Sequence, residues 1–371
     1  MDFEFSDDQE QLRDACAKWV SKGYTFERRR SIVAAGGFSR DAYGEMAELG
    51  LCGLYIPEAR GGSGMGAIEG MVVMQELGRG MVLEPLVQTL MASLLLSLYA
   101  TPELQENWLG NIAGGKSLVV LAQQERKRRY RLEQCEASAT LGSASWVLSG
   151  LKNVVPAGDA ADAFIVPAMA QGQLALFLVE AKAPGVTTRG YATQDGSRAA
   201  DLRCTNTPAA LLTLDGLAAL EHAVDIGIAA NCAQAVGGMD QALAITVDYM
   251  NTRKQFGVAI ASFQALRHRV ADMKMQLELG RSMSYYAHLK LNSRAPERRM
   301  AIARAKVQMG ASMRFVGQQA VQLHGGIGVT DEYIVSHYFK RLTQLEMEFG
   351  DSLHHLGEVS QRMQDTAGVF A

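Results

Sequence analysis

Cysteine is scarce in this sequence, and its spacing gives no sign that the cysteines act together. The five residues of this type contain no Cys-x-x-Cys pair and lie far apart, at Cys16, Cys52, Cys135, Cys204 and Cys232. Such spacing argues against a disulfide framework and against a cysteine-based zinc site. We therefore interpret the five as reduced core thiols and expect no metal site.

Strong net charge and long apolar runs are missing as well. The formal net charge is -3 and the pI is about 6.2, which offers no attraction for nucleic acid. The most apolar stretch, residues 81–99, contains Glu84 and Pro85 and is too short beyond them to span a bilayer, so we expect a buried helix there. The acidic start Met1-Asp2-Phe3-Glu4-Phe5 lacks the basic and apolar segments of a secretion signal. These absences predict a cytoplasmic protein without a membrane span.

The hydrophobic period changes twice along the 371 residues, which indicates three regions. Residues 1–115 show apolar positions at helical spacing, and Ser6 with Gln9 resembles a capping box at the first helix. Residues 116–215 hold short apolar runs divided by turn residues, as in a small β-domain. Residues 216–371 return to long helical patterns. The predicted fold class is therefore α+β, with an N-terminal helical domain, a middle β-domain and a C-terminal four-helix bundle.

The separate elements are expected from the same patterns. Helices of the first region are predicted at residues 9–20, 43–49, 68–77 and 86–98. Strands are predicted at residues 117–122, 145–149, 163–167, 175–180 and 199–203. Helices of the bundle are predicted at residues 217–251, 262–291, 296–323 and 331–345.

One motif lies between the first two bundle helices. The turn Arg253-Lys254-Gln255-Phe256-Gly257 is followed by Ser262-Phe263-Gln264, where the next helix begins. A guanidinium beside a glycine turn and a helix N-terminus can hold an anion, because both supply N–H donors and positive potential. The alternative is an arginine that only solvates a helix junction.

A second motif, Gln322-Leu323-His324-Gly325-Gly326-Ile327-Gly328, follows a long predicted helix. Glycines let a backbone approach a ligand closely, but they also end helices. His324 alone would more often be a packed histidine than a base.

The two motifs together resemble the acyl-CoA dehydrogenase family in order and spacing, as do the loop at residues 57–66 and the segment Glu76-Leu77-Gly78-Arg79. The resemblance covers nearly the whole chain and implies the three-domain fold already predicted. It also implies α,β-desaturation of an acyl-CoA substrate: FAD takes a hydride from Cβ, and a glutamate removes the α-proton. An electron-transfer flavoprotein would be the electron acceptor.

In this family each FAD is shared across a dimer interface. One subunit holds the flavin ring with its β-domain and C-terminal loop, and the neighbour holds the pyrophosphate and adenine end with its bundle. The resemblance assigns eight residues of this chain to the neighbour's FAD: Arg253, Gln255, Phe256, Phe263, Gln264, Gln322, Gly325 and Gly326.

The segments that would face this chain's own flavin depart from the family pattern. Where the family carries Thr-Glu-Pro and a Gly-Ser-Asp turn, residues 122–131 hold a basic run, which we interpret as a solvated surface loop. Where the family has a Trp and a Thr beside the flavin, the chain has Val154 and Pro156. Neither side chain can donate a hydrogen bond, and proline has no backbone N–H.

The C-terminal loop departs most. Counted from Lys340, the family's catalytic glutamate falls on Phe349, its glycine on Gly350 and its threonine on Asp351. A phenyl ring cannot accept a proton. Glu348 and Asp351 are weak candidates for a base. Some relatives place the base on the first bundle helix, near Gly227 here, and Asp225 and Glu221 lie close to that position without matching it.

We therefore hypothesise a subunit that has lost its own catalytic glutamate and completes the FAD site of a paralogous partner that carries one, in an α2β2 assembly. The chain resembles the smaller subunits of bacterial enzymes for sterol-derived or dicarboxylic acyl-CoAs. One alternative is a self-sufficient homomer with a displaced base. Another is a non-enzymatic assembly or acyl-CoA-binding subunit. His354 and His355 are expected at the surface or an interface, since neighbouring helix residues face different ways.

Overall fold

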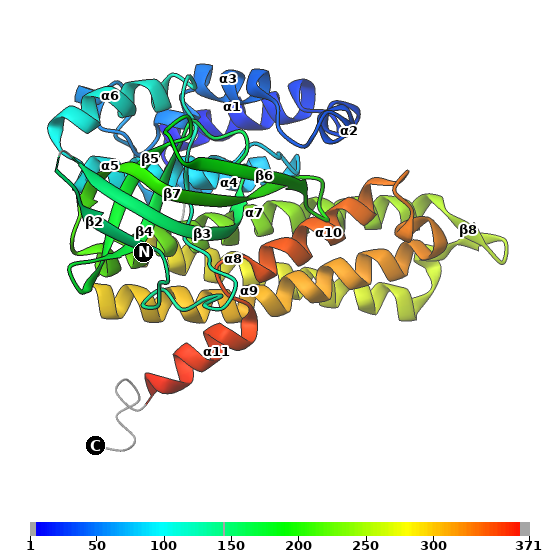
Figure 1. The fold of residues 1–371 in the computed structure, drawn as a ribbon. Coiled ribbons are helices and arrows are strands. Elements are labelled where there is room, and N and C mark those ends of the chain that lie inside the picture. The colour runs from blue at the N-terminus through cyan, green and yellow to red at the C-terminus, as the bar shows by residue number, and fades with distance from the viewer. Residues whose placement is uncertain (1–4, 144, 364–371) are drawn as a thin grey trace. The chain divides into compact units, whose positions relative to one another are not determined.

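The computed structural model describes residues 5–143 and 145–363, and its elements follow the predicted order of helices, strands and helices (Figure 1). The start Met1–Glu4, on which the expectation about a secretion signal rested, lies outside the described residues. The chain forms two compact units. The bundle unit falls within residues 1–28, 67–82 and 228–371, and the sheet unit within residues 29–66 and 83–227. The predicted domain boundaries at residues 115 and 215 stay predictions.

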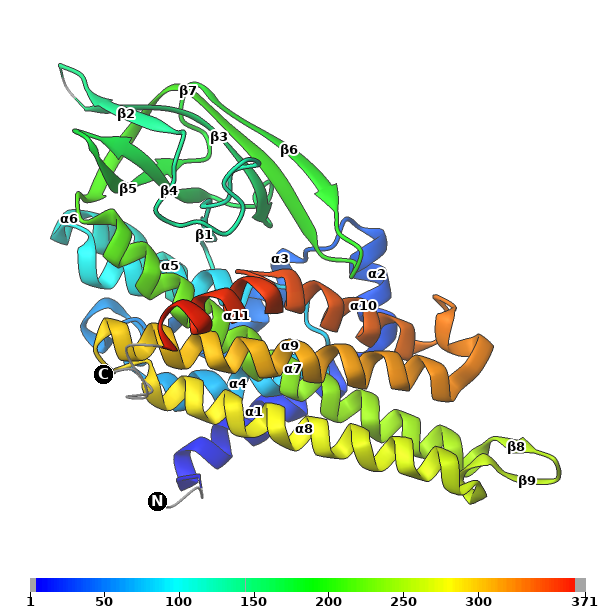
Figure 2. The ribbon, with the colours of Figure 1, turned by 90° about the horizontal axis from the view of Figure 1, so that it is seen from below.

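Long helices dominate the bundle unit, and α8 packs along α9 (Figure 2). A short hairpin of β8 (Lys254–Gln255) and β9 (Val258–Ala259) follows α7, and two 3-10 turns, η3 (Ile260–Ser262) and η4 (Gly325–Val329), precede α8 and follow α9. The helices are α1 (Asp7–Gly23), α4 (Ala67–Arg79), most of α7 (Gly216–Thr252), α8 (Gln264–Lys290), α9 (Ala295–His324), α10 (Ile334–Met347) and α11 (Ser352–Gln361).

Local signals in the sequence account for two features of this unit. The predicted capping box is confirmed at α1, where the Ser6 hydroxyl accepts from the Gln9 N–H and the Gln9 side chain accepts from the Ser6 N–H. Paired glycines let α4 and α7 approach closely: a Cβ at Gly78 would collide with the Gln234 backbone, and one at Gly237 with the Gln75 backbone.

The sheet unit contains a sheet that closes on itself. Strands β4, β2, β3, β7 and β5 pair in that order, and β5 pairs with β4 again. β1 extends the sheet parallel to β4, and β6 pairs with β7. The strands are β1 (Val119–Leu121), β2 (Ser138–Leu141), β3 (Trp146–Pro156), β4 (Ala163–Ala170), β5 (Gln173–Glu180), β6 (Val186–Ala192) and β7 (Arg198–Thr213). The helices are α3 (Arg40–Glu48), α5 (Leu86–Tyr99) and α6 (Pro102–Ala113), with 3-10 turns η1 (Leu51–Gly53) and η2 (Glu58–Arg60), and α2 (Phe26–Ala34) spans the unit boundary.

The predicted α+β class is confirmed, and so are most of its long elements. The stretch 86–98, expected to be a buried helix, is α5, with most of its side chains buried. Three helices, α2, α6 and α11, and four strands, β2, β6, β8 and β9, were not predicted. Within the described part of the chain, no helix is both long and apolar enough to cross a membrane.

Candidate functional site

The first predicted motif forms a hairpin at the end of α7. Between β8 and β9, Phe256 and Gly257 both have positive φ angles, 53° and 82°, as a two-residue type I′ turn requires. Glycine adopts this conformation readily, but a bulky side chain in it is strained. The Phe256 side chain is 92% exposed, and its ring meets the ring of Phe263 edge-on, with centroids 6.1 Å apart. The hairpin therefore presents a phenyl ring to the outside at a cost in backbone energy.

Polar groups of the same hairpin also point to a contact outside the chain. Arg253, Lys254 and Gln264 are exposed, and within residues 5–143 and 145–363 no acidic side chain pairs with Arg253. The Gln255 amide donates only to the neighbouring Lys254 carbonyl. Helix α8 begins at Gln264 without a side-chain cap, and while the Leu266 N–H donates to the Phe263 carbonyl, the N–H groups of Gln264 and Ala265 have no backbone partner among the described residues. This set of donors suits an anion.

The second motif lies at the same end of the bundle unit. The Tyr249 hydroxyl, one turn before Arg253, donates to the His324 carbonyl over 3.3 Å, and the two rings stack with centroids 4.4 Å apart. Gly325 has a φ of 66°, and a Cβ built at Gly325 or Gly326 meets no described atom within 4 Å. Both glycines are thus open to an outside group, and Gln322 before them is exposed.

His324 has the properties of a packed residue with one unused nitrogen. Its side chain is buried, and burial lowers its pKa, so the ring stays neutral near pH 7. Its Nδ1 hydrogen-bonds the Ala320 carbonyl over 2.7 Å, which fixes the proton on Nδ1. Nε2 has no partner among the described residues. It is therefore an unfilled acceptor beside Gly325.

The loop after α10 holds Phe349 where the resemblance places a glutamate. Phe349 has a φ of 58° and Gly350 a φ of 112°. The Phe349 carbonyl accepts a hydrogen bond from His355 Nε2 over 3.0 Å. A Cβ at Gly350 would lie 2.6 Å from the His354 ring and 2.7 Å from the His355 ring. Both histidines therefore restrict the backbone of this loop.

The two carboxylates beside Phe349 have structural partners. Glu348 accepts a hydrogen bond from the Asn231 amide over 2.8 Å and lies 3.6 Å from the Arg341 guanidinium. Asp351 caps α11 by accepting from the backbone N–H of His354 over 2.9 Å. Both carboxylates are thus engaged in contacts that hold the loop and the start of α11.

His354 and His355 were expected at the surface or an interface, but His355 is buried within the chain. Its side chain is 4% exposed. Burial, helped by the nearby Lys306 ammonium, lowers the pKa of His355 to about 3. Lys306 is itself buried and donates to the Leu345 carbonyl in the last turn of α10. A cation at a helix C-terminus is favourable, so the buried Lys306 stabilises the end of α10. The neutral His355 holds the following loop through the Phe349 carbonyl.

In the sheet unit, the basic run at residues 126–131 is mostly exposed, but the residue before it is not. Glu125 is 4% exposed and pairs with Lys152, which is 2% exposed, over 2.7 Å. The carboxylate also accepts from the backbone N–H groups of Glu136 and Ala137. Burial alone would raise the pKa of Glu125, but Lys152 and the N–H donors outweigh it and hold the pKa below its ordinary value. The loop is therefore anchored from beneath, which the sequence pattern did not reveal.

Val154 occupies an irregular position of β3. The register between β3 and β7 shifts between Lys152 and Val155, as at a β-bulge. Val154 has a φ of 51°, a strained angle for a β-branched residue, and its side chain is 40% exposed. Pro156 ends the strand. Asp225, the remaining base candidate, is fully buried on α7.

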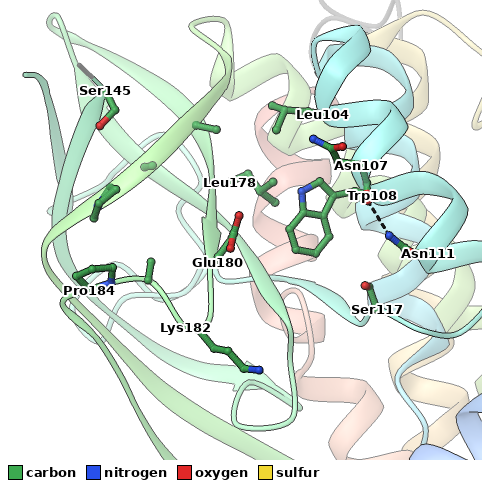
Figure 3. Close-up of a pocket in the computed structure, with 14 residues that line it drawn as sticks. Leu104, Asn107, Trp108, Asn111, Ser117, Ser145, Leu178, Glu180, Lys182 and Pro184 are labelled. Atoms are coloured by element: carbon green, nitrogen blue, oxygen red, sulfur yellow. Dashed lines mark hydrogen bonds between the residues drawn. The ribbon is translucent and has the colours of Figure 1, made fainter. Parts of the chain in front are cut away.

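A groove of about 760 Å³ in the sheet unit contains none of the predicted site residues (Figure 3). The Trp108 ring of α6 faces it, with Leu178 and Ala209 among the apolar lining and Glu180 at its edge. The Asn111 amide is engaged with the Asn107 carbonyl over 2.8 Å. The predicted site residues thus do not coincide with this groove, and the eight predicted FAD-binding residues lie instead at the hairpin end of the bundle unit.

Comparisons with known proteins agree over most of the chain. Residues 6–116 match the model for the acyl-CoA dehydrogenase N-terminal domain, and residues 215–364 match the model for the C-terminal domain. The acyl-CoA dehydrogenase IpdE2 of Mycobacterium tuberculosis is 30% identical over 338 residues, which cover 90% of this chain and 91% of that protein. A solved steroid ACAD variant named Tcur3481-Tcur3483 has a TM-score of 0.90 at 28% identity, covering 98% of this chain and 99% of that one. The ChsE4-ChsE5 complex from Mycobacterium tuberculosis has a TM-score of 0.91 at 25% identity, covering 99% and 100%.

Proposed function

This chain belongs to the acyl-CoA dehydrogenase family, and we propose that it is the subunit of a heteromeric enzyme that completes the partner's FAD site without supplying a catalytic base. The observation that carries the proposal is an asymmetry between two sets of residues. The hairpin and glycine loop of the bundle unit are open to an outside ligand. The segments expected to face the chain's own flavin hold Phe349 and Val154, both at positive φ, and a loop anchored by the buried pair of Glu125 with Lys152.

The open set fits the pyrophosphate end of FAD. The Arg253 guanidinium, which has no acidic partner in the described chain, would bind the pyrophosphate through paired N–H donors. The backbone of Gly325 and Gly326 would approach the same anion, since no side chain shields it. The Phe256 ring would pack against the cofactor or the surrounding partner surface. FAD, when bound, supplies the acceptor for the hydride removed from the substrate.

The comparisons support a heteromer and suggest a substrate class. Two of the similar structures carry paired chain names, Tcur3481-Tcur3483 and ChsE4-ChsE5, and the first is described as a steroid ACAD. We therefore favour a steroid-derived acyl-CoA as the substrate of the assembled enzyme. An electron-transfer flavoprotein would then accept the electrons, as the family resemblance implies.

The visible flavin spectrum of the chain, purified alone and after co-expression with the partner dehydrogenase, tests the central claim. We expect a colourless chain alone and a yellow complex. A chain that is yellow alone, and whose flavin is reduced by acyl-CoA, would instead establish a self-sufficient homomer. Full activity of the partner without this chain would support a non-enzymatic assembly subunit.

Substitution at the hairpin gives a sharper test within the complex. Arg253→Ala removes the proposed pyrophosphate contact, and Lys254→Ala is the matched control because it removes the same charge from the adjacent exposed position. Hydrogen bonds to charged groups contribute about 1.5–3 kcal/mol, so Arg253→Ala is expected to weaken FAD binding by roughly tenfold to 100-fold. Equal FAD affinities for the two variants, measured by titration of the deflavinated complex, would contradict the assignment.

A further inference from the structure

Three reactive side chains of the sheet unit lie in mutual contact, and none of them is assigned to the FAD contact of the proposed function. Cys135 Sγ is 3.4 Å from Lys152 Nζ and 3.3 Å from Glu125 Oε1, and Lys152 Nζ is 2.7 Å from the same carboxylate oxygen. Lys152 comes from β3, and Cys135 lies just before β2. A thiol, an amine and a carboxylate thus meet at one point.

The position of Cys135 differs from that of the other cysteines. Cys16, Cys52, Cys204 and Cys232 are buried, whereas Cys135 is partly exposed. Cys135 is therefore more accessible to a small oxidant than the four buried cysteines are, while the amine beside it is almost fully buried, with Lys152 2% exposed. The partial exposure of Cys135 favours access of the oxidant, and the burial of Lys152 restricts the position of the attacking amine.

We propose that Cys135 and Lys152 form a reversible crosslink when the protein meets hydrogen peroxide. In the first step the Cys135 thiolate attacks peroxide, the O–O bond breaks, and sulfur becomes a sulfenic acid while the other oxygen leaves as hydroxide. In the second step the Lys152 amine attacks that sulfur. The S–N bond forms, the S–O bond breaks, and the hydroxyl takes a proton from the amine nitrogen and leaves as water. The net change is the loss of two hydrogens from the protein and the reduction of one peroxide.

Glu125 has a defined part in the second step. An ammonium has no lone pair, so Lys152 must release a proton before it can attack sulfur. The hydroxide released in the first step takes that proton and becomes water, while the Glu125 carboxylate holds the amine beside the sulfur through its hydrogen bond. The N–H groups of Glu136 and Ala137 keep the carboxylate oriented throughout.

The crosslink would protect an otherwise vulnerable sulfur. A sulfenic acid that meets more peroxide goes on to sulfinic acid, which ordinary thiols do not reverse, whereas an S–N bond is opened by a thiol. Burial raises the pKa of Cys135, and the nearby Lys152 opposes that rise only in part, so the reactive thiolate is a minor species. Formation is therefore slow and calls for excess peroxide. The inference does not depend on the proposed function.

Peptide mapping by mass spectrometry of the full chain tests it. After treatment with excess hydrogen peroxide and quenching, we expect a peptide that joins Cys135 to Lys152, two hydrogens lighter than its reduced parts, which dithiothreitol returns to free peptides. Cys135→Ser should abolish the linked peptide while keeping the pair of Lys152 with Glu125. Lys152→Arg keeps the positive charge but lacks a condensing amine, so the linked peptide should be lost and Cys135 sulfinic acid should accumulate.

Peroxide treatment of the wild-type chain in denaturant provides a control that needs no folded variant, and there the linked peptide should be absent. Three results would overturn the proposal. They are a Cys135 that stays reduced, a Cys135 that is oxidised to the same products in wild type and Lys152→Arg, and a linked peptide found only in a form one oxygen heavier, because the proposed condensation leaves no oxygen in the crosslink.

Discussion

His355 shows how a single residue can couple this fold to pH. Its ordinary pKa is 6.5, and in the folded chain it falls to about 3, because burial and Lys306 disfavour the charged ring. Below pH 6.5 His355 is therefore mostly protonated in the unfolded chain and still mostly neutral in the folded chain. The contribution of His355 to the free energy of unfolding is therefore highest above that value and falls as the pH approaches about 3. The loss is about 2 kcal/mol by about pH 5.

The variant His355→Gln should remove this dependence while keeping an N–H donor for the Phe349 carbonyl. Urea unfolding at about pH 7 and about pH 5 measures the effect, and the wild-type chain should lose about 2 kcal/mol more than the variant. His288, whose pKa burial lowers to about 4, acts in the same range in both proteins, so only their difference reports His355. His354→Gln serves as a neighbouring control. Parallel curves for wild type and His355→Gln would refute the assignment.

Single residues differed in how far the sequence could predict them. Arg253 and the glycines at 325 and 326 stood in short motifs whose chemistry is local, so their exposure on a turn and a loop followed from the pattern. The pairing of Glu125 with Lys152 did not, because the two residues are 27 positions apart and meet only through the folding of the sheet unit. The burial of His355 likewise depends on how α11 packs, which no spacing rule states.

At the scale of elements, α4 and α7 approach each other closely at paired glycines in the bundle unit. A side chain at Gly237 would overlap the carbonyl oxygen of Gln75, which belongs to the backbone of α4 and cannot rotate away. Gly237→Ala must therefore push the helices apart, and we expect a loss of about 3 kcal/mol in the free energy of unfolding.

The adjacent Gly238→Ala is the matched control. A Cβ there would lie 3.5 Å from the Leu342 side chain, an ordinary contact, so the helix propensity of alanine should make this variant neutral or more stable by up to about 1 kcal/mol. Urea midpoints of the two variants give the comparison. Similar midpoints would show that the close helix contact does not exist.

Elements with a strong period of their own were predictable, and those defined by their neighbours were not. The predicted helices at 217–251 and 296–323 match α7 and α9 within two residues at each end. β6 was missed because most of its side chains are exposed, so it lacks an alternating apolar pattern and exists through its pairing with β7. The hairpin of β8 and β9 was anticipated only as a turn, since two-residue strands leave no period to detect.

For the molecule as a whole, restoring one missing group should not restore activity. Phe349→Glu returns a carboxylate to the family position. Val154, Pro156 and the loop anchored by Glu125 would still depart from the family pattern. We expect the isolated variant to stay colourless and to show no acyl-CoA-dependent reduction of a dye acceptor. The complex of the partner with the wild-type chain is the positive control. An active, yellow Phe349→Glu chain would show that the glutamate was the only function lost.

The strained Phe256 turn has a consequence for the energetics of association. Its phenyl ring is 92% exposed, and covering such a side chain is worth about 1.5–3 kcal/mol. The hairpin is already ordered, so its association with a partner carries no added entropic cost of ordering a loop. The unassembled chain thus carries the backbone strain of this turn without compensation. The free energy of burying the Phe256 ring is gained only when another surface covers it.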